Sequence, residues 1–525
     1  MKNTVSIFAG HDSNITFYDA KNDKYHVIEL ERLLKKRYFR LHVDNDPQTI
    51  IQILSQCRDI AEKYWGIEND YDAVITVQDG WLDPNIIREV FNTNEVRQFA
   101  DHHHSHAAGA FYMSPYEKAL IISYDGGGND GHFLIYEGSE KGVSPIAKVE
   151  SDFGGGYLLC GSTIRDITEK TRNPLAIAGK LMGLCAYGNV NETWLPEFRK
   201  IFFDRDYKGL AERTGLPFKN VDDPWGQVLT NWNFENQEAY DIAAATQRAF
   251  EDCFFGILES LMEKHPDLPL VITGGAGLNV LANEKIKVRY GKDVYVPPNP
   301  NDCGLSVGNL FLYKKPSKRV DVTYNGLPLL DIENLESEIE KRKAVKVTKK
   351  EVAELVKNGK IVGLVYGDSE VGPRALGNRS IVCDPAYPDM KNILNSKVKF
   401  REWFRPFAPF CKKEEAHLYF DSPNFENLEY MSYAPMVKEE YKDKLPSITH
   451  VDGSSRLQTV TPESHEGFYE LLDEFGKLSD TNVLLNTSFN IRGYPILSTI
   501  EDALHVLDNT ELDYVVIEDY LFSKD

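Results

Sequence analysis

The sequence lacks several features that would place it in a specialised class of protein. No apolar run reaches the length of a membrane-spanning helix, and the N-terminal stretch MKNTVSIFAGHDSN meets a polar turn too early for a signal peptide. The seven cysteines are scattered along the chain and form no C-x-x-C pair, which excludes a zinc ribbon or a disulfide framework and indicates reduced thiols. We therefore expect a cytoplasmic protein without a membrane partner.

Positive charge is also scarce. The 525 residues include 59 Lys and Arg against 80 Asp and Glu, a net charge of −21, which argues against broad nucleic-acid binding. A hydrophobic content of 42% and a charged content of 26% are typical of a globular enzyme. The length of 525 residues predicts two or more domains. The chain turns polar between Tyr313 and Lys349, so we predict one domain over residues 1–335 and a second over 345–525.

The segment ADHHHSHAAGAFYMSPYEKALIISYDGGGNDG (100–131) is the most informative part of the sequence. His102 and His106 lie four residues apart in a stretch of helix formers, a spacing that directs two imidazoles from one helix face toward a divalent metal. Asp125 ends an apolar strand and begins a glycine turn, although Asp130 competes with it as a carboxylate ligand. A capped surface helix without metal is the simpler alternative.

Asp302, in the segment NPNDCG (299–304), is the candidate for a fourth ligand. It also stands where a helix N-cap would stand, and capping would explain it equally well. Two imidazoles and two carboxylates suit iron, manganese or zinc and leave room for water or a substrate.

A weak internal repeat predicts an α/β fold. VSIFAGHDSNITFYDA and LIISYDGGGNDGHFLIYEG both read as strand, polar turn and strand, and LPLVITGGAGLNVLANEKI reads as strand, glycine turn and helix. These are the parts of a duplicated ATPase fold of the actin, chaperone and sugar-kinase type. The turns could hold phosphate through their backbone N–H groups, and the candidate residues there are Gly127, Gly128, Gly274, Gly275 and Asn279.

The turn that contains His11 and Asp12 could hold a phosphate, a proton-transferring group or a metal-bound water, or it could be an ordinary hairpin. The segment ELERLLKKRYFR follows it and offers Lys35, Lys36 and Arg37, which need no function if they form a solvated charged face.

The second half of the chain collects cations near glycine-rich loops. Arg374 lies in EVGPRALGNRS, and arginine is a planar, bidentate ligand for phosphate or carboxylate. We predict that this half binds a polyanion such as ATP, with scattered surface charge as the alternative. The candidate residues are Arg374, Lys399, Arg405, Arg456, Asn486 and Ser488.

Nine motifs in a fixed order carry a resemblance to the O-carbamoyltransferases that act on antibiotics and nodulation factors, such as the tobramycin, cephamycin and nodulation-factor enzymes. The motifs are GHDSN (10–14), HHHSHAAGAF (102–111), YDGGG (124–128), GKLMGLCAYG (179–188), GGAGLN (274–279), NPNDCG (299–304), GPRALGNRSI (372–381), KFREWFRPFAP (399–409) and NTSFNIRGYPI (486–496). Together they cover essentially the whole chain.

The resemblance implies an N-terminal domain like the metal-bearing tRNA threonylcarbamoyl transferase, of the actin-like ATPase class, followed by a smaller YrdC-like domain. It implies that carbamoyl phosphate and ATP, with Mg²⁺, form carbamoyl-adenylate in the second domain. The carbamoyl group would then move to a hydroxyl of a small-molecule acceptor in the first domain.

Carried onto this sequence, the resemblance implies His102, His106, Asp125 and Asp302 as metal ligands, with Fe²⁺ the expected metal. His11, Asp12 and Lys36 would act near the acceptor or the carbamoyl group. Arg374, Lys399, Arg405 and Arg456 would hold carbamoyl phosphate and the nucleotide phosphates.

Two positions depart from the family pattern. Ala178 replaces a common Glu before the Gly-Lys motif, and Tyr494 replaces a common Glu near the C-terminus, which leaves contacts to the acceptor or nucleotide open. A tRNA threonylcarbamoylation enzyme and a non-enzymatic, ATP-gated binding protein are the alternative functions. The acceptor and the oligomeric state stay open, and a homodimer is compatible with the sequence.

Overall fold

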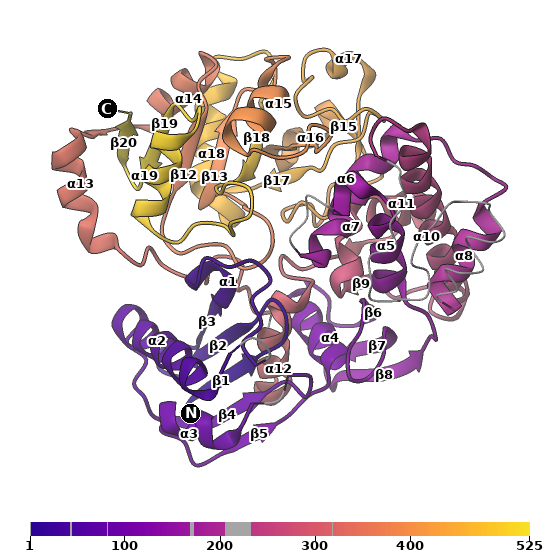
Figure 1. The fold of residues 1–525 in the computed structure, drawn as a ribbon, viewed down its shortest axis with the longest axis vertical. Helices are drawn as coiled ribbons and strands as arrows, with labels where there is room; N and C mark the ends of the chain where they lie inside the picture. Colours follow the sequence, from indigo (N-terminus) through magenta and orange to yellow (C-terminus); the bar gives the residue numbers. More distant parts are fainter. Residues whose placement is uncertain are drawn as a thin grey trace.

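The computed structural model describes residues 2–42, 45–80, 82–168, 173–204, 233–317 and 319–524. In this part of the chain the strands form three large sheets and one two-stranded pair. Two five-stranded sheets use residues before 296, and an eight-stranded sheet uses residues after 344 (Figure 1). The fold is therefore mixed α/β, as the sequence predicts.

The first sheet has the strand order β3-β2-β1-β4-β5. Its first three strands are antiparallel neighbours, whereas β1, β4 and β5 run parallel. Val5 and Ile7 alternate with Thr4 and Ser6 along β1, so one face of the strand is apolar and the other is polar, and both are buried. The strands are β1 (Asn3–Phe8), β2 (Asn14–Asp19), β3 (Lys24–Glu29), β4 (Tyr71–Thr76) and β5 (Val96–Gln98).

The second sheet repeats this topology, with the order β10-β9-β6-β7-β8. Here β6, β7 and β8 are antiparallel neighbours, and β6, β9 and β10 run parallel. The repeat that the sequence suggested is thus present as two sheets of the same strand order and direction. The strands are β6 (Ala119–Tyr124), β7 (Phe133–Ser139), β8 (Gly142–Lys148), β9 (Leu270–Thr273) and β10 (Val294–Tyr295).

Two helices separate these sheets. α12 (Leu305–Lys314) packs on β1 and β2, and α4 (His102–Met113) packs on β6 and β9. The two helices also pack closely against each other, as Figure 1 shows between the two groups of strands. The residues that begin α4 and precede α12 therefore lie between the halves of the repeat.

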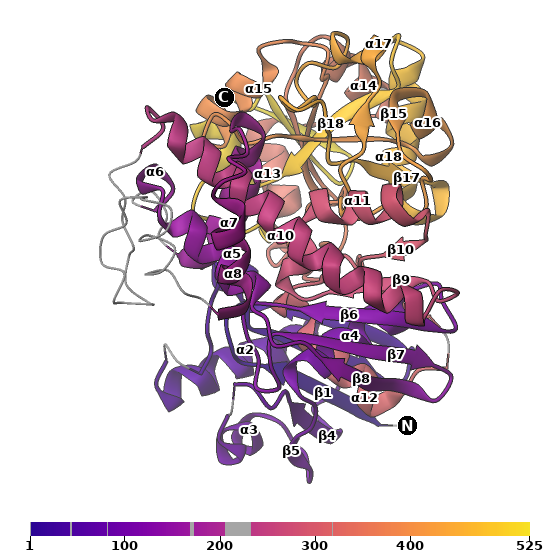
Figure 2. The same ribbon diagram turned by 90° about the vertical axis from the view of Figure 1, so that its right-hand side faces the viewer.

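The remaining helices and 3-10 turns of the first half lie around the two sheets, with α2 packed on the first sheet. α2 begins at a Pro after the Asp46 cap and ends at Gly66, whose left-handed φ of 67° suits glycine. The longest helix, α10, packs against α5, α7 and α8 (Figure 2). The helices are α1 (Leu30–Leu33), α2 (Pro47–Trp65), α3 (Pro84–Val90), α5 (Phe153–Ser162), α6 (Arg165–Thr168), η1 (Pro174–Ala176), α7 (Ile177–Leu184), η2 (Cys185–Tyr187), α8 (Leu195–Asp204), α10 (Gln237–Lys264), η3 (Gly275–Leu278), α11 (Val280–Tyr290) and η4 (Asp302–Gly304).

The third sheet has the order β11-β20-β19-β12-β13-β18-β14-β17. Most of its neighbours are antiparallel, but β12 with β19 and β14 with β17 are parallel. The strands, with the separate pair β15 and β16, are β11 (Val345–Lys346), β12 (Val362–Val365), β13 (Arg379–Cys383), β14 (Ala408–Lys412), β15 (Phe420–Asp421), β16 (Met436–Val437), β17 (Gln458–Val460), β18 (Val483–Ser488), β19 (Tyr514–Ile517) and β20 (Tyr520–Ser523).

Helices α14 and α18 pack together against this sheet, and α19 packs on β19. A capping box between Thr348 and Glu351 begins α14. The helices of this half are η5 (Ile332–Asn334), α13 (Leu335–Arg342), α14 (Lys349–Lys357), α15 (Met390–Ile393), the π-helix η6 (Leu394–Val398), η7 (Lys413–Glu415), α16 (Ala416–Tyr419), α17 (Glu439–Lys442), α18 (Pro462–Gly476) and α19 (Ile500–Asn509).

Buried polar contacts join the eight-stranded sheet and its loops to the first half. Arg32 of α1 pairs with Glu29 and donates to the backbone carbonyls of Glu370 and Gly372, both at 2.5 Å. Lys180 of α7 pairs with Glu402 at 2.8 Å, and both side chains are nearly inaccessible to solvent. These contacts hold the loops of the second half against the first.

Among the described residues no helix is long and apolar enough to cross a membrane. All seven cysteines are free and buried.

Candidate active site

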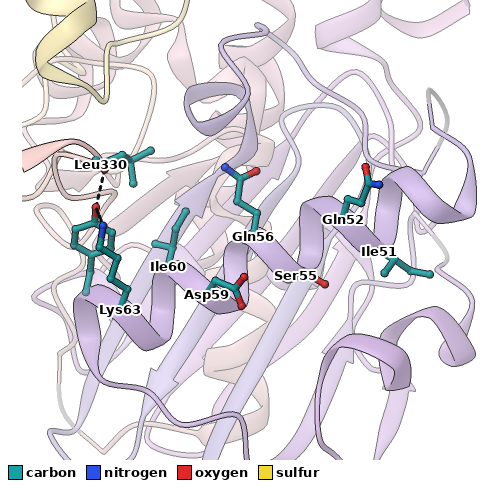
Figure 3. A pocket seen from close by; sticks show the side chains of 9 residues that line it. Ile51, Gln52, Ser55, Gln56, Asp59, Ile60, Lys63 and Leu330 are labelled. Atoms are coloured by element: carbon teal, nitrogen blue, oxygen red, sulfur yellow. Dashed lines mark hydrogen bonds between the residues drawn. The ribbon is translucent and has the colours of Figure 1, made fainter.

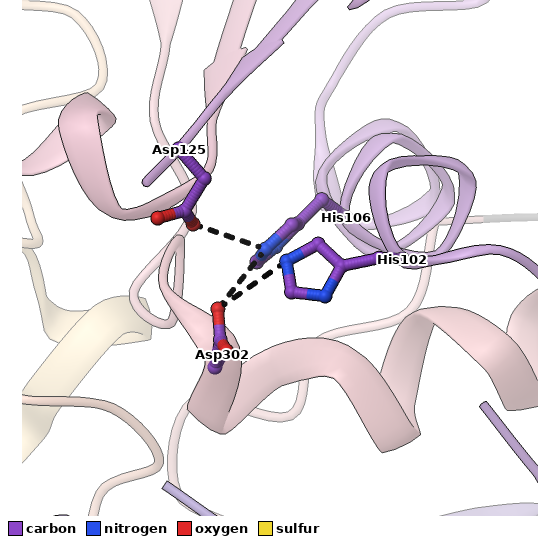
Figure 4. A group of neighbouring side chains, drawn as sticks. All are labelled: His102, His106, Asp125 and Asp302. Atoms are coloured by element: carbon purple, nitrogen blue, oxygen red, sulfur yellow. Dashed lines mark ion pairs between the residues drawn. The ribbon is translucent and has the colours of Figure 1, made fainter. Parts of the chain in front are cut away.

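The structure brings together four residues from three distant segments. His102 and His106 come from the first turns of α4, Asp125 follows β6, and Asp302 begins η4 (Figure 4). One ligand atom from each residue lies within 4.8 Å of the others. His106 Nε2 stands 3.4 Å from both Asp125 Oδ2 and Asp302 Oδ1, and His102 Nε2 stands 3.6 Å from Asp302 Oδ1.

These donors fit a divalent metal. Nε2 of His102 and Nε2 of His106 are buried and have no hydrogen-bond partner, which is costly unless a ligand completes them. Burial alone would lower the pKa of His106, but the carboxylates of Asp125 and Asp302 raise it to about 9. Two carboxylates thus face two imidazoles in a buried space where a cation would balance the charge.

The two carboxylates left open by the sequence have different places. Asp125 faces His106, and its carboxylate also accepts the backbone N–H groups of Gly126 and Gly275. Asp130 instead accepts the N–H of His103 at the start of α4 and lies outside the four-residue cluster. Asp302 is not a helix N-cap, because Asn301 precedes η4 and Gly304 precedes α12, and its carboxylate faces the cluster.

Two glycines allow this close approach. A Cβ on Gly128 would lie 2.8 Å from the His102 ring, and a Cβ on Gly275 would lie 2.8 Å from Asp125 Oδ1. Gly274, with a φ of +86°, passes against the backbone of Tyr124. Gly127 lies beside His132, and Asn279 caps α11 and hydrogen-bonds Gln247. Gly128 and Gly275 thus leave room for His102 and Asp125, and phosphate binding by these turns stays a prediction.

His11 and Asp12 border the cluster. His11 Nε2 lies 3.2 Å from Asp302 Oδ2, and its Nδ1 lies 3.1 Å from Asp12 Oδ2. Burial works against charge on His11, but Asp302 and Asp12 raise its pKa to about 10. Asn14 of the same turn donates to the backbone carbonyls of Asp12 and Asp302, which ties the two segments together.

Lys36 lies in the loop that follows α1. Its side chain is exposed and stands over the Phe39 ring, 5.4 Å from the centroid. Next to it, Arg37 donates to the Tyr38 hydroxyl at 2.8 Å, and Tyr38 N–H donates to Glu31. Burial raises the pKa of Tyr38, with opposing effects from Arg37 and Arg405 and a further increase from Asp12.

The cations of the second half form a crowded cluster. Burial and the neighbouring Arg405 lower the pKa of Arg374 to about 10. Burial also lowers the pKa of Arg456, with Arg374, Arg401 and Arg405 adding to the effect, and its Nε is buried with no hydrogen-bond partner. Like charges held this close favour a bound anion, since phosphate oxygens would relieve the repulsion.

Lys399 is anchored beside this cluster. Its ammonium donates to Ser488 O, at 2.5 Å, and to Asn490 O, at 2.8 Å. Asn486 in β18 donates to Ala375 O and to Gln458, which joins the strand to the Arg374 loop. Tyr494 is 53% exposed on the loop after β18, and Ala178 is partly buried in α7.

Sequence reasoning missed Glu370, which shapes the Arg374 loop. One carboxylate oxygen, Oε1, accepts four backbone N–H groups at 2.6 to 3.1 Å, those of Leu376, Gly377, Asn378 and Arg379. Arg379 is fully buried and donates to the carbonyls of Tyr366 and Gly367, so it is a structural arginine. A buried acid before a glycine- and arginine-rich loop was the available indication.

Sequence reasoning also missed Asp79, whose Oδ2 lies 3.2 Å from His102 Nδ1. This hydrogen bond lowers the pKa of Asp79. The strand and turn VITVQDG repeat the apolar strand followed by Asp and Gly seen at Asp125, and this pattern could have identified it.

A separate groove of about 490 Å³ runs along the outer face of α2 (Figure 3). Its lining includes Gln52, Gln56, Lys63 and Leu330, and Tyr64 donates to Leu330 O at 2.7 Å. None of the residues that line it belongs to the four-residue cluster or to the arginine cluster, which consists of Arg374, Arg401, Arg405 and Arg456.

Comparison with known families identifies the class of protein. Residues 59–310 match the family model "Carbamoyltransferase N-terminus", and residues 353–524 match "Carbamoyltransferase C-terminus". The chain belongs to the carbamoyltransferase family and is an enzyme of this class.

Among the similar proteins, nodulation protein NolO of Bradyrhizobium diazoefficiens is 30% identical over 444 residues, which cover 81% of this chain and 79% of NolO. Nodulation protein NolNO of Sinorhizobium fredii is 32% identical over 446 residues, which cover 81% of this chain. The chain spans 64% of the length of NolNO.

Two solved structures share a distant likeness. Full-length HypF in the phosphate- and nucleotide-bound form has a TM-score of 0.35 and 14% identity, covering 59% of this chain and 46% of HypF. The activator of 2-hydroxyisocaproyl-CoA dehydratase from Clostridium difficile has a TM-score of 0.32 and 13% identity, covering 61% and 99%. Likeness at this level does not define the fold.

Proposed function

We propose that this protein is an ATP-dependent O-carbamoyltransferase with two separate sites. The second half, of YrdC-like type, forms carbamoyl-adenylate from carbamoyl phosphate, ATP and water, and releases phosphate and pyrophosphate. The first half, of actin-like ATPase type, transfers the carbamoyl group to a hydroxyl of a small-molecule acceptor and releases AMP. The observation that carries this proposal is the convergence of His102, His106, Asp125 and Asp302 in a chain that also holds a crowded arginine cluster.

The arginine cluster suits the first step. Carbamoyl phosphate and the triphosphate of ATP bring several negative charges into one site, and Mg²⁺ accompanies ATP. Arg374, Arg405 and Arg456 already repel one another, so phosphate oxygens would find preorganised donors there. Lys399 follows η6 and Ser488 ends β18, and the two would fix one edge of the anion site.

The four-residue cluster suits the second step. His102, His106, Asp125 and Asp302 would hold a divalent metal, with Fe²⁺ preferred and Mn²⁺ or Zn²⁺ as alternatives. When bound, the metal acts as a Lewis acid that polarises the carbamoyl carbonyl. The two carboxylates and two imidazoles leave coordination positions for an oxygen of the substrate.

His11 and Asp12 would handle the proton of the acceptor hydroxyl. Nδ1 of His11 is hydrogen-bonded to the Asp12 carboxylate, and Nε2 of the same ring faces the Asp302 carboxylate. Because the pKa of His11 is raised to about 10, its ring is protonated, and the Asp12 carboxylate is the group that would accept the hydroxyl proton. Loss of this proton makes the acceptor oxygen a better nucleophile.

The direct test is product analysis. The purified chain is incubated with ATP, carbamoyl phosphate and a panel of hydroxylated acceptors that includes amino sugars, nucleosides and lipo-oligosaccharides. We expect mass spectrometry to detect an acceptor that gains one carbamoyl group only when both co-substrates are present. Carbamoylation that proceeds without ATP would contradict the adenylate route.

A further inference from the structure

Asp79 lies at the sheet edge that carries the candidate metal centre. β1 and β4 are parallel neighbours, with Ile7 paired to Thr76, so their carboxyl ends meet at one edge. The turn with His11 and Asp12 follows β1, and Asp79 follows β4. The two turns touch, because a Cβ on Gly80 would lie 3.1 Å from the backbone nitrogen of Gly10.

From this position Asp79 reaches the side of His102 that faces away from the cluster. Asp79 Oδ2 lies 3.2 Å from Nδ1 of the imidazole. The opposite nitrogen, Nε2, is the buried one that faces Asp302, as Figure 4 shows. A carboxylate accepts only a hydrogen bond, so this contact requires the proton to stand on Nδ1.

Among the described residues, ring and glycine packing holds the remaining sides of the His102 ring. The edge of Phe8 stands at 6.1 Å between ring centroids, and Gly128 passes so closely that a Cβ would lie 2.8 Å from the imidazole. These contacts fix the plane of the ring but do not distinguish its two nitrogens. Asp79 provides the polar contact that distinguishes Nδ1 from Nε2.

We propose that Asp79 is a positioning residue for the metal centre. Its carboxylate accepts the Nδ1–H of His102 and so keeps the lone pair of Nε2 directed at the metal. This inference rests on the proposed metal centre of the previous section. Carboxylates behind a ligating imidazole orient the ring and increase its basicity, and their loss commonly lowers metal affinity by about 10- to 100-fold.

The substitutions Asp79→Ala and Asp79→Asn test this role. Alanine removes the acceptor, whereas asparagine can turn its NH₂ group toward Nδ1 and favour the wrong tautomer. The side chain of Asp79 is 45% exposed, so neither change opens a cavity in the core. Asp83→Asn is the matched control, because Asp83 lies in the same segment and caps α3.

Affinity is measured on the full chain with Co²⁺ as the probe, by competition with a chelator and by the visible absorption of the bound ion. We expect both Asp79 variants to bind Co²⁺ about 10- to 100-fold more weakly than the parent, with an altered absorption band. Asp83→Asn should match the parent, and all metal-free chains should unfold at the same temperature.

Unchanged Co²⁺ affinity and absorption in both Asp79 variants would overturn the positioning role while leaving the metal centre in place. Failure of the parent itself to bind Co²⁺ would overturn the metal centre, and the positioning role with it. The two failures are distinguishable because the second occurs in the unmodified chain.

Discussion

His26 shows how burial sets the protonation of a single side chain. It lies in β3, 8% exposed, and its ring stacks on Trp65 with 4.4 Å between centroids. Nδ1 is buried without a hydrogen-bond partner. Burial lowers the pKa of His26 to about 4, so the folded chain keeps this ring neutral.

We expect His26→Phe to make the protein more resistant to acid. Below pH 6.5 the unfolded chain takes up a proton that the folded chain refuses until about pH 4, so the free energy of unfolding falls across this window. The loss from this residue amounts to about 3 kcal/mol by pH 4. Phenylalanine keeps the stacking and removes the titration.

Urea unfolding of the parent and the variant at several pH values between 7 and 4 measures the effect. The difference in stability should grow in favour of the variant as the pH falls. Parallel curves over this range would show that His26 does not contribute to acid sensitivity.

Individual site residues differ in how well the sequence predicts them. His102 and His106 could be chosen because helical spacing alone places them on one face. Asp125 could not be separated from Asp130, since both follow the same strand and only the path of the turn directs one to His106. Asp79 contacts His102 of a distant segment and Glu370 contacts the backbone of its own loop, so the local pattern marks each residue but not its partner.

The contact between α4 and α12 is the element on which the cluster depends. α4 carries both histidines, and Asp302 lies in η4, directly before α12. The helices meet at glycines, where a Cβ on Gly109 would lie 3.4 Å from the Cα of Gly308. A Cβ on Gly308 would overlap the backbone carbonyl of Ser105.

Gly308→Ala is therefore expected to force the two helices apart. Overpacking of this kind costs about 1–3 kcal/mol, and the shift would also separate Asp302 from the histidines and weaken metal binding. Thermal unfolding and metal affinity of the purified variant measure both effects.

Gly256→Ala is the matched control, because Gly256 lies inside α10 and a Cβ there meets nothing within 4 Å. This change should leave stability equal or raise it by up to about 1 kcal/mol, since alanine is the better helix former. A Gly308→Ala variant as stable as this control would contradict the close-packing explanation.

At the level of elements, periodic segments were predictable and irregular ones were not. The apolar pattern around HHHSHAAGAFY corresponds to α4, and the segment KKEVAELVKNG corresponds to α14. The Arg374 loop has no regular period, and its shape depends on four N–H groups that converge on Glu370. Such a loop can be recognised from its glycine and proline content, but the path of its backbone cannot be predicted from the sequence.

On the scale of the whole molecule, two halves of different architecture face each other. The repeated five-stranded sheets hold the four-residue cluster between them, and the eight-stranded sheet carries the cations. Arg32 and Lys180 bridge the halves through buried contacts, and Arg37 and Tyr38 extend from the first half toward Arg405. The repeat was visible in the sequence, whereas these long-range contacts were not.

Under the proposed function, activation and transfer are separable reactions. Substitutions in the arginine cluster should stop the formation of carbamoyl-adenylate, whereas substitutions of the metal ligands should stop only the transfer to the acceptor. Both kinds of variant retain the other site, because no residue belongs to both clusters.

The most direct measurement is ATP–pyrophosphate exchange in the full chain, with and without carbamoyl phosphate. We expect exchange that requires carbamoyl phosphate in the parent, persists in the double variant His102→Ala and His106→Ala, and disappears in Arg374→Ala. Exchange that survives in Arg374→Ala, or that is lost together with the two histidines, would contradict a two-site carbamoyltransferase.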